Sequence, residues 1–149
     1  MVDLPKRIAA EKENVDRALS DLKDAMARKE KSTIELAAAA TFLHNIYGGM
    51  EHILKQVLKA KGTKIAKSET WHKELLALSV SNRIIPEELS DELYEYLTFR
   101  HFFVHAYGFM LEEAHLEHLT NNIPGIWSQF LSAVERYSRS SNDNEHPKG

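Results

Sequence analysis

The chain has 149 residues, 43% of them hydrophobic, and a formal net charge of −3 at pH 7. These values are typical of one folded domain and exclude a strongly basic nucleic-acid binder. The lack of cysteine excludes disulfides, thiolate catalysis and cysteine zinc sites, and no run approaches the roughly 20 apolar residues of a membrane span. The N-terminal residues carry charges throughout and form no apolar signal core, so we expect a cytoplasmic protein.

The first helix is predicted over residues 4–31, where apolar residues recur at three- and four-residue steps. Ser32 and Glu35 form a capping-box pattern that predicts the start of the second helix. We expect the second helix to reach Lys61 and to end at Gly62, since glycine favours a helix C-terminus.

Two adjacent glycines, Gly48 and Gly49, fall inside this second helix. Each costs about 1 kcal/mol relative to alanine in a helix interior. Close approach of another helix would offset that cost, and a kink is the rival explanation. A short third helix is predicted over residues 69–80, and a fourth over residues 86–108.

A fifth helix is predicted over residues 112–137, kinked or restarted at Pro124 and Gly125. Residues 138–149 are polar and predict a disordered tail, which leaves one domain over residues 1–137. No strand pattern or internal repeat appears. Five helices with short connections therefore predict an all-α, antiparallel helical bundle.

Charge is uneven along the chain. Between residues 52 and 85 there are seven basic residues and two acidic ones, whereas residues 86–120 hold eight acidic residues and one basic one. Two interpretations fit this pattern equally well: two solvated helix faces, or a basic path along which the backbone of a polyanion could run. The candidates for contact with an RNA backbone are Lys55, Lys59, Lys64, Lys67 and Lys73.

Arg100 and His105 lie five residues apart near the end of the predicted fourth helix. A histidine can exchange a proton near neutral pH, and an arginine can grip two phosphate oxygens, so the pair suits cleavage of RNA by its own 2′-hydroxyl, without a metal or cofactor. In an ideal α-helix the two side chains are about 140° apart. A shared site then needs a helix end, a long reach of the arginine, or a second copy of the helix. Composition alone favours a solvent-facing pair.

An ordered set of motifs gives this pair more weight. The chain resembles the HepT-type ribonuclease toxins of the HEPN superfamily over about residues 38–130. The resemblance rests first on a motif of arginine, any four residues, histidine, any one residue and tyrosine, which lies in Arg100-His101 to His105-Ala106-Tyr107-Gly108-Phe109. It rests also on three segments that precede the motif, which are Tyr47-Gly48-Gly49-Met50-Glu51, Trp71-His72-Lys73-Glu74-Leu75-Leu76 and Glu95-Tyr96.

The resemblance implies a helical bundle that pairs about a two-fold axis, so that two copies of the motif share one cleft. Arg100 and His105 would be catalytic, and His101 would assist. The substrate would be RNA, with tRNA as one class. The partner would be an MntA-like nucleotidyltransferase antitoxin that silences the toxin by AMPylation of Tyr107. The alternative is a non-catalytic HEPN subunit that binds a nucleotide or the transferase and keeps Arg100 as an anion clamp.

Other candidate residues are interpreted as structural. Trp71 is expected in the core and His72 as a capping or surface residue. Tyr47 and Glu51 lie four apart and could face the cleft, but helix packing is favoured. A second set has metal-ligand spacing and is interpreted as surface side chains: Glu112, His115 and His118. We expect no metal site.

Overall fold

The computed structural model describes residues 3–107 and 111–145, with the backbone alone at 106–107 and 141–145. Within these ranges the chain forms helices and no strand. The helices are α1 (Leu4–Ala25), α2 (Thr33–Lys61), α3 (Trp71–Ser81), α4 (Glu87–Phe102), a π-helical segment (Phe103–Tyr107) and α5 (Glu113–Glu145). The predicted all-α class and five-helix bundle are confirmed.

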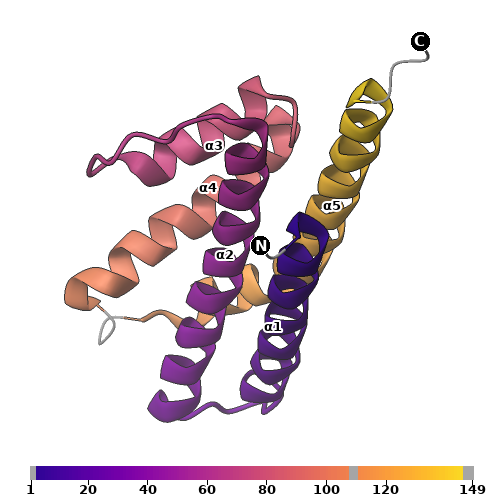
Figure 1. The fold of residues 1–149 in the computed structure, drawn as a ribbon. Helices are drawn as coiled ribbons and strands as arrows, with labels where there is room; N and C mark the ends of the chain where they lie inside the picture. Colours follow the sequence, from indigo (N-terminus) through magenta and orange to yellow (C-terminus); the bar gives the residue numbers. More distant parts are fainter. Residues whose placement is uncertain (1–2, 108–110, 146–149) are drawn as a thin grey trace.

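Helix α2 is the central element of the bundle (Figure 1). It has α1 and α5 on one side and α3 and α4 on the other. Its start is the predicted capping box: the Ser32 hydroxyl accepts a bond from the Glu35 amide at 3.1 Å, and the Glu35 carboxylate accepts one from the Ser32 amide at 2.9 Å. It ends at Gly62, whose φ of 87° lies in the left-handed region that glycine tolerates.

The two glycines of α2 differ in their surroundings. A Cβ on Gly49 would overlap Cγ2 of Val15 on α1, whereas a Cβ on Gly48 would meet nothing within 4 Å. Since α2 continues unbroken through both residues, close approach of α1 explains Gly49. Gly48 needs another explanation, and it lines a cavity described below.

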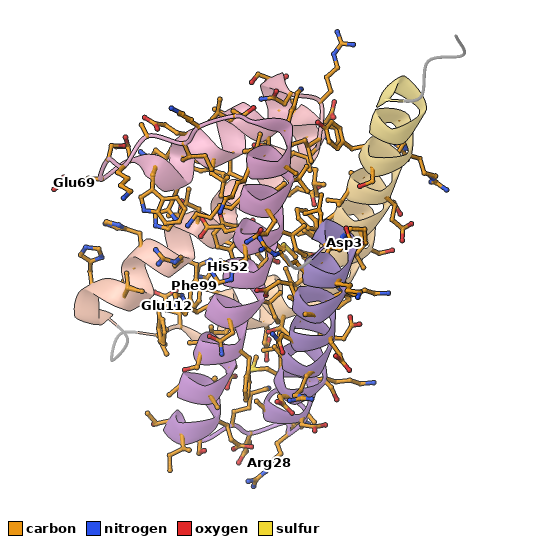
Figure 2. All side chains as sticks on the ribbon, viewed as in Figure 1. Asp3, Arg28, His52, Glu69, Phe99 and Glu112 are labelled. Carbon is orange, nitrogen blue, oxygen red and sulfur yellow. The ribbon has the colours of Figure 1, made fainter. Side chains whose placement is uncertain are left out.

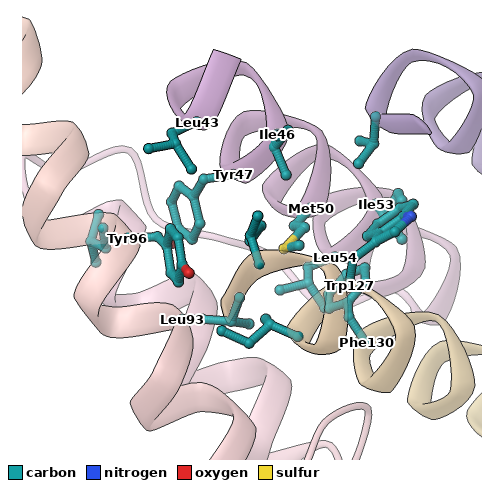
Figure 3. Close-up of a cluster of buried hydrophobic side chains, with 14 of the residues drawn as sticks. Leu43, Ile46, Tyr47, Met50, Ile53, Leu54, Leu93, Tyr96, Trp127 and Phe130 are labelled. Carbon is teal, nitrogen blue, oxygen red and sulfur yellow. The ribbon is translucent and has the colours of Figure 1, made fainter. Parts of the chain in front are cut away.

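The core lies where α2, α4 and α5 meet (Figure 3). Its large side chains come from all three helices and are almost completely buried: Leu43, Ile46, Tyr47, Met50, Ile53, Leu54, Leu93, Tyr96, Trp127 and Phe130. Two hydrogen bonds tie the polar ends of aromatic residues to neighbouring helices. Tyr96 Oη donates to the Leu119 carbonyl at 2.7 Å, and Trp127 Nε1 donates to Asp16 at 2.9 Å.

Helix α1 ends earlier than predicted, at Ala25 and not near Lys31. Met26 is the last residue of the apolar stripe, and residues 27–31 are exposed or only partly buried. A further helical turn would therefore bury no apolar side chain. The chain turns instead towards the capping box at Ser32.

Helix α5 is longer than predicted and is one continuous element. It runs through Pro124 without a restart, because buried residues on both sides, Ile123 and Ile126 among them, hold it against the core. It then passes Tyr137 and reaches Glu145, so residues 138–145, predicted as disordered tail, are helical. No glycine or proline interrupts this polar stretch. None of the described helices is long and apolar enough to cross a membrane.

Candidate active site

Three side chains, one each from α2, α3 and α4, are linked in a row. The Glu51 carboxylate of α2 lies 2.8 Å from Nδ1 of His72 on α3. Nε2 of the same imidazole lies 3.2 Å from Nη1 of Arg100 on α4. Since a guanidinium can only donate, His72 Nε2 must accept, which places the imidazole proton on Nδ1 and directs it to Glu51. The row is therefore carboxylate, neutral imidazole, guanidinium.

This arrangement corrects the expectation for His72, which is neither a cap nor a surface residue. Its side chain is 17% exposed and that of Glu51 is 4% exposed. Glu51 was considered as a cleft residue but helix packing was favoured, and the structure has it lining a cavity. The signal that was missed is that this acidic residue falls on the apolar face of α2 beside Met50 and Leu54. A buried carboxylate is costly without a partner, so one had to come from another helix.

Two aromatic side chains, Trp71 and Tyr47, adjoin this row. The Trp71 ring lies 3.6 Å from that of His72, centroid to centroid, and Lys55 Nζ lies 3.9 Å above the Trp71 ring. Trp71 is half-buried rather than fully in the core. Burial, followed by the neighbouring Glu51 charge, raises the pKa of the Tyr47 hydroxyl, which therefore stays protonated.

His105 lies on the π-helical segment and is exposed. Its Nδ1 donates to the backbone carbonyl of His101 at 2.9 Å, and the two imidazole centroids are 4.2 Å apart. Because a carbonyl can only accept, Nδ1 carries the proton, and Nε2 of the neutral ring keeps its lone pair. That nitrogen is suited to take a proton from a hydroxyl.

The π-helical segment changes the geometry expected between Arg100 and His105. Helix four was predicted as α-helix to Gly108, but it changes to the wider π-helical turn at Phe103. The 140° separation of an ideal α-helix therefore does not apply. Within the described part of one chain, no hydrogen bond or ring contact joins the two side chains. Arg100 faces His72, and His105 is exposed.

A cavity of about 600 Å³ opens between α1, α2, α3 and α4 beside this row. Arg100, His72 and Glu51 line it together with Lys55, Gly48 and His44. His44 is partly buried, and its ring lies 5.6 Å from that of Phe103. Burial, and then the positive charge of Arg100, lowers the pKa of His44, although the Glu51 charge acts in the opposite direction.

This shift predicts a loss of stability in acid. The folded protein resists protonation of His44, whereas the unfolded chain protonates it near the ordinary value of 6.5. The contribution is therefore intact above that pH and is lost as the pH falls below it. We expect the free energy of unfolding of His44→Gln to fall less than that of the wild type between about pH 7 and 5. Urea titrations across this range measure the difference, and parallel curves would contradict it.

The five lysines predicted for RNA contact lie on α2, on α3 and in the loop between these helices. Lys55 lies at the cavity, and Lys73 Nζ lies 6.0 Å above the Tyr94 ring of α4. Lys59 of α2 and Lys64 and Lys67 of the following loop are exposed. Lys55 therefore shares a cavity with Arg100 and lies over the Trp71 ring, and the other four lysines are exposed.

The three residues with metal-ligand spacing have separate surroundings, and Glu112 is exposed directly before α5 (Figure 2). His118 Nε2 lies 2.9 Å from Glu95, and the His115 ring makes an edge contact with Phe99 at 6.0 Å. In residues 3–107 and 111–145 there is no group of three histidine or carboxylate side chains that could hold a metal ion. The side chain of Tyr107 lies outside the described part of the structure.

Comparison with known proteins adds a family. The family model described as HepT-like protein matches residues 38–141, a range that contains Glu51, His72, Arg100 and His105. No curated protein and no solved structure matches the chain.

Proposed function

The chain belongs to the HepT-like family of HEPN proteins, and on this premise we propose that it is a metal-independent endoribonuclease, the toxin of a toxin–antitoxin pair. Arg100 and His105 would be its catalytic residues, with His101 assisting. RNA in the cytoplasm would be its substrate, with tRNA as one class. The observation that carries the proposal is His105 itself, because its Nδ1 bond to a carbonyl leaves Nε2 as an exposed proton acceptor.

The chemistry follows from these groups. His105 Nε2 removes the proton of a ribose 2′-hydroxyl, and the oxygen attacks the adjacent phosphorus. The bond to the 5′-oxygen breaks, and that oxygen takes a proton from a protonated imidazole, leaving a 2′,3′-cyclic phosphate and a 5′-hydroxyl. The Arg100 guanidinium stabilises the charge that builds on the phosphate oxygens. The contact between the His101 and His105 rings, whose centroids are 4.2 Å apart, supports an assisting role for His101.

A two-fold dimer would bring the separated side chains together. Val104 lies next to His105, and its side chain is 45% exposed, one of three large apolar side chains exposed among the described residues. If two copies paired across this segment, the Val104 side chain of each copy would be covered by the other copy, as in a two-fold interface. It would also bring a second His105 to the cleft that contains Arg100.

The proposal is tested by cleavage without metal. We expect the purified protein to cut RNA in excess EDTA and to leave 2′,3′-cyclic phosphate ends, detected by mass spectrometry of the fragments. DNA of the same sequence is the matched control and should remain intact, because it lacks the internal nucleophile. Complete resistance of a broad RNA panel, tRNA included, would overturn the nuclease assignment.

We further propose that an MntA-like nucleotidyltransferase silences this protein at Tyr107. The tyrosine oxygen would attack the α-phosphorus of ATP, releasing pyrophosphate and a proton and leaving AMP on the side chain. Tyr107 lies two residues after His105, so the added negative charge would repel the phosphate of an RNA substrate.

The modification is measured by intact mass after incubation with the transferase and ATP. The wild type should gain the mass of one or more AMP groups and lose its nuclease activity, whereas Tyr107→Phe should gain none. Tyr94→Phe is the matched control, since Tyr94 is an exposed tyrosine on α4, and it should be modified like the wild type. A mass increase in Tyr107→Phe would contradict the assignment.

A second candidate function follows from the orientation of Arg100. Its side chain lines the cavity and bonds to His72, and it does not contact His105 within one chain. A non-catalytic subunit could use this guanidinium as a clamp for the phosphate of a nucleotide. Binding of a nucleotide by the wild type but not by Arg100→Ala, without any RNA cleavage, would favour this function over the first.

A further inference from the structure

We propose that His72, held by Glu51, is a positioning residue that fixes the orientation of the Arg100 guanidinium. The inference deepens the proposed function and rests on it where it concerns RNA cleavage. It adds two residues from two other helices to a site that the sequence motif confines to the end of α4.

The first step is the anchor. Glu51 is 3% exposed on the central helix, so its carboxylate is largely removed from water. His72 Nδ1 lies within hydrogen-bond distance of this carboxylate, at 2.8 Å. Because this carboxylate accepts the Nδ1 proton, it fixes both the tautomer and the rotation of the imidazole ring. The Trp71 ring, 3.6 Å away, restricts that ring from the side.

The second step is the hydrogen bond between His72 and Arg100. The lone pair of His72 Nε2 points to Nη1 at 3.2 Å. An arginine has five N–H donors in a planar fork, so one bond to His72 leaves the remaining donors for a phosphate. The imidazole thus orients the plane of the fork without blocking it.

The third step is the reason that this hydrogen bond matters for catalysis. A long arginine side chain has many rotamers, and a catalytic group that must first find its orientation gives up part of its effect. The residues of this row are 21 and 28 positions apart in the sequence, and the packing of α2, α3 and α4 brings them together. Arg100 is therefore oriented before any substrate arrives.

The experiment compares substitutions that keep or remove the two hydrogen bonds. His72→Leu removes both, and His72→Gln keeps an acceptor for Arg100 and a donor for Glu51. We expect His72→Leu to lower kcat for RNA cleavage by about 10- to 100-fold with a much smaller change in KM, and His72→Gln to recover most of the rate. Glu51→Gln removes the charge and should lie between the two.

The matched control is a second histidine–glutamate pair at the same cavity. His52 Nδ1 lies 3.2 Å from Glu11, and among the residues that the structure describes no hydrogen bond links this pair to Arg100. His52→Leu should therefore keep the wild-type kcat. Circular dichroism and thermal unfolding identify any variant that fails to fold. If His72→Leu fails to fold because it leaves the buried Glu51 carboxylate without a partner, the double variant Glu51→Leu/His72→Leu replaces it in the comparison.

A second readout does not depend on activity. Nitrogen-15 relaxation of the Arg100 Nε–H group reports how rigid the guanidinium is, and it should show increased mobility in His72→Leu but not in His52→Leu. Active wild type with unchanged kcat in His72→Leu would overturn the positioning role and leave the nuclease assignment intact. Inactive wild type would overturn the nuclease assignment, and the relaxation data would then decide the inference. Equal mobility of the Arg100 guanidinium in the wild type and in His72→Leu would refute the positioning role.

Discussion

Alanine at Arg100 or at His105 is expected to lower the rate of RNA cleavage by about 10³-fold. Loss of the guanidinium removes stabilisation of the charged phosphate oxygens, and loss of the imidazole removes the base that activates the 2′-hydroxyl. Since both act in one step, the double variant should be hardly slower than the slower single variant. Single-turnover cleavage of labelled RNA in EDTA measures all three rates.

Both substitutions should leave the fold intact, because His105 is exposed and Arg100 is only partly buried. The thermal midpoint and the circular dichroism spectrum provide this control. His101→Ala should reduce the rate by less, since His101 contributes a backbone carbonyl to His105 that alanine retains. Wild-type cleavage by a folded Arg100→Ala protein would remove the motif from the catalytic mechanism.

The Arg100→Ala and His105→Ala variants also test whether the site is shared between two chains. Neither variant is expected to be active alone. In a mixed dimer, one chain retains Arg100 and the other retains His105, so a cleft built from both chains would recover part of the activity. A site contained within one chain would recover none, and the two-fold arrangement would then be wrong.

Alanine at Gly49 and alanine at Gly48 are expected to change stability in opposite directions. Either substitution gains about 1 kcal/mol of helix propensity. At Gly48 nothing opposes this gain, because the new Cβ meets open space. At Gly49 the Cβ overlaps Val15, which is 1% exposed, and forcing the two helices apart costs about 1–3 kcal/mol.

Urea unfolding of the two variants measures the difference, and each kcal/mol should also move the thermal midpoint by about 2–4 °C for a chain of this size. The cause is tested by Val15→Ala, which removes the methyl group that the new Cβ would meet. In that background Gly49→Ala should be less damaging than in the wild type. A Gly49→Ala protein as stable as Gly48→Ala would refute the close approach of α1 and α2.

The sequence predicted those features of the fold that depend on neighbouring residues. The capping box at Ser32 and the helix end at Gly62 are local patterns, and the structure has both. The ends of α1 and α5 were predicted wrongly. Helix α1 stops at Ala25 because a further turn would bury no apolar side chain, whereas α5 continues past the buried Val134 through a polar stretch that no glycine or proline interrupts.

The candidate site divides in the same way. The motif placed Arg100 and His105 at the end of the fourth helix from the sequence alone, and their catalytic role remains a prediction. Tertiary structure decided what Arg100 contacts: a histidine from α3 that is itself held by a buried glutamate of α2. Short-range spacing determines which face of a helix a side chain occupies. The partner on that face depends on how the helices pack, and no local pattern in the chain encodes it.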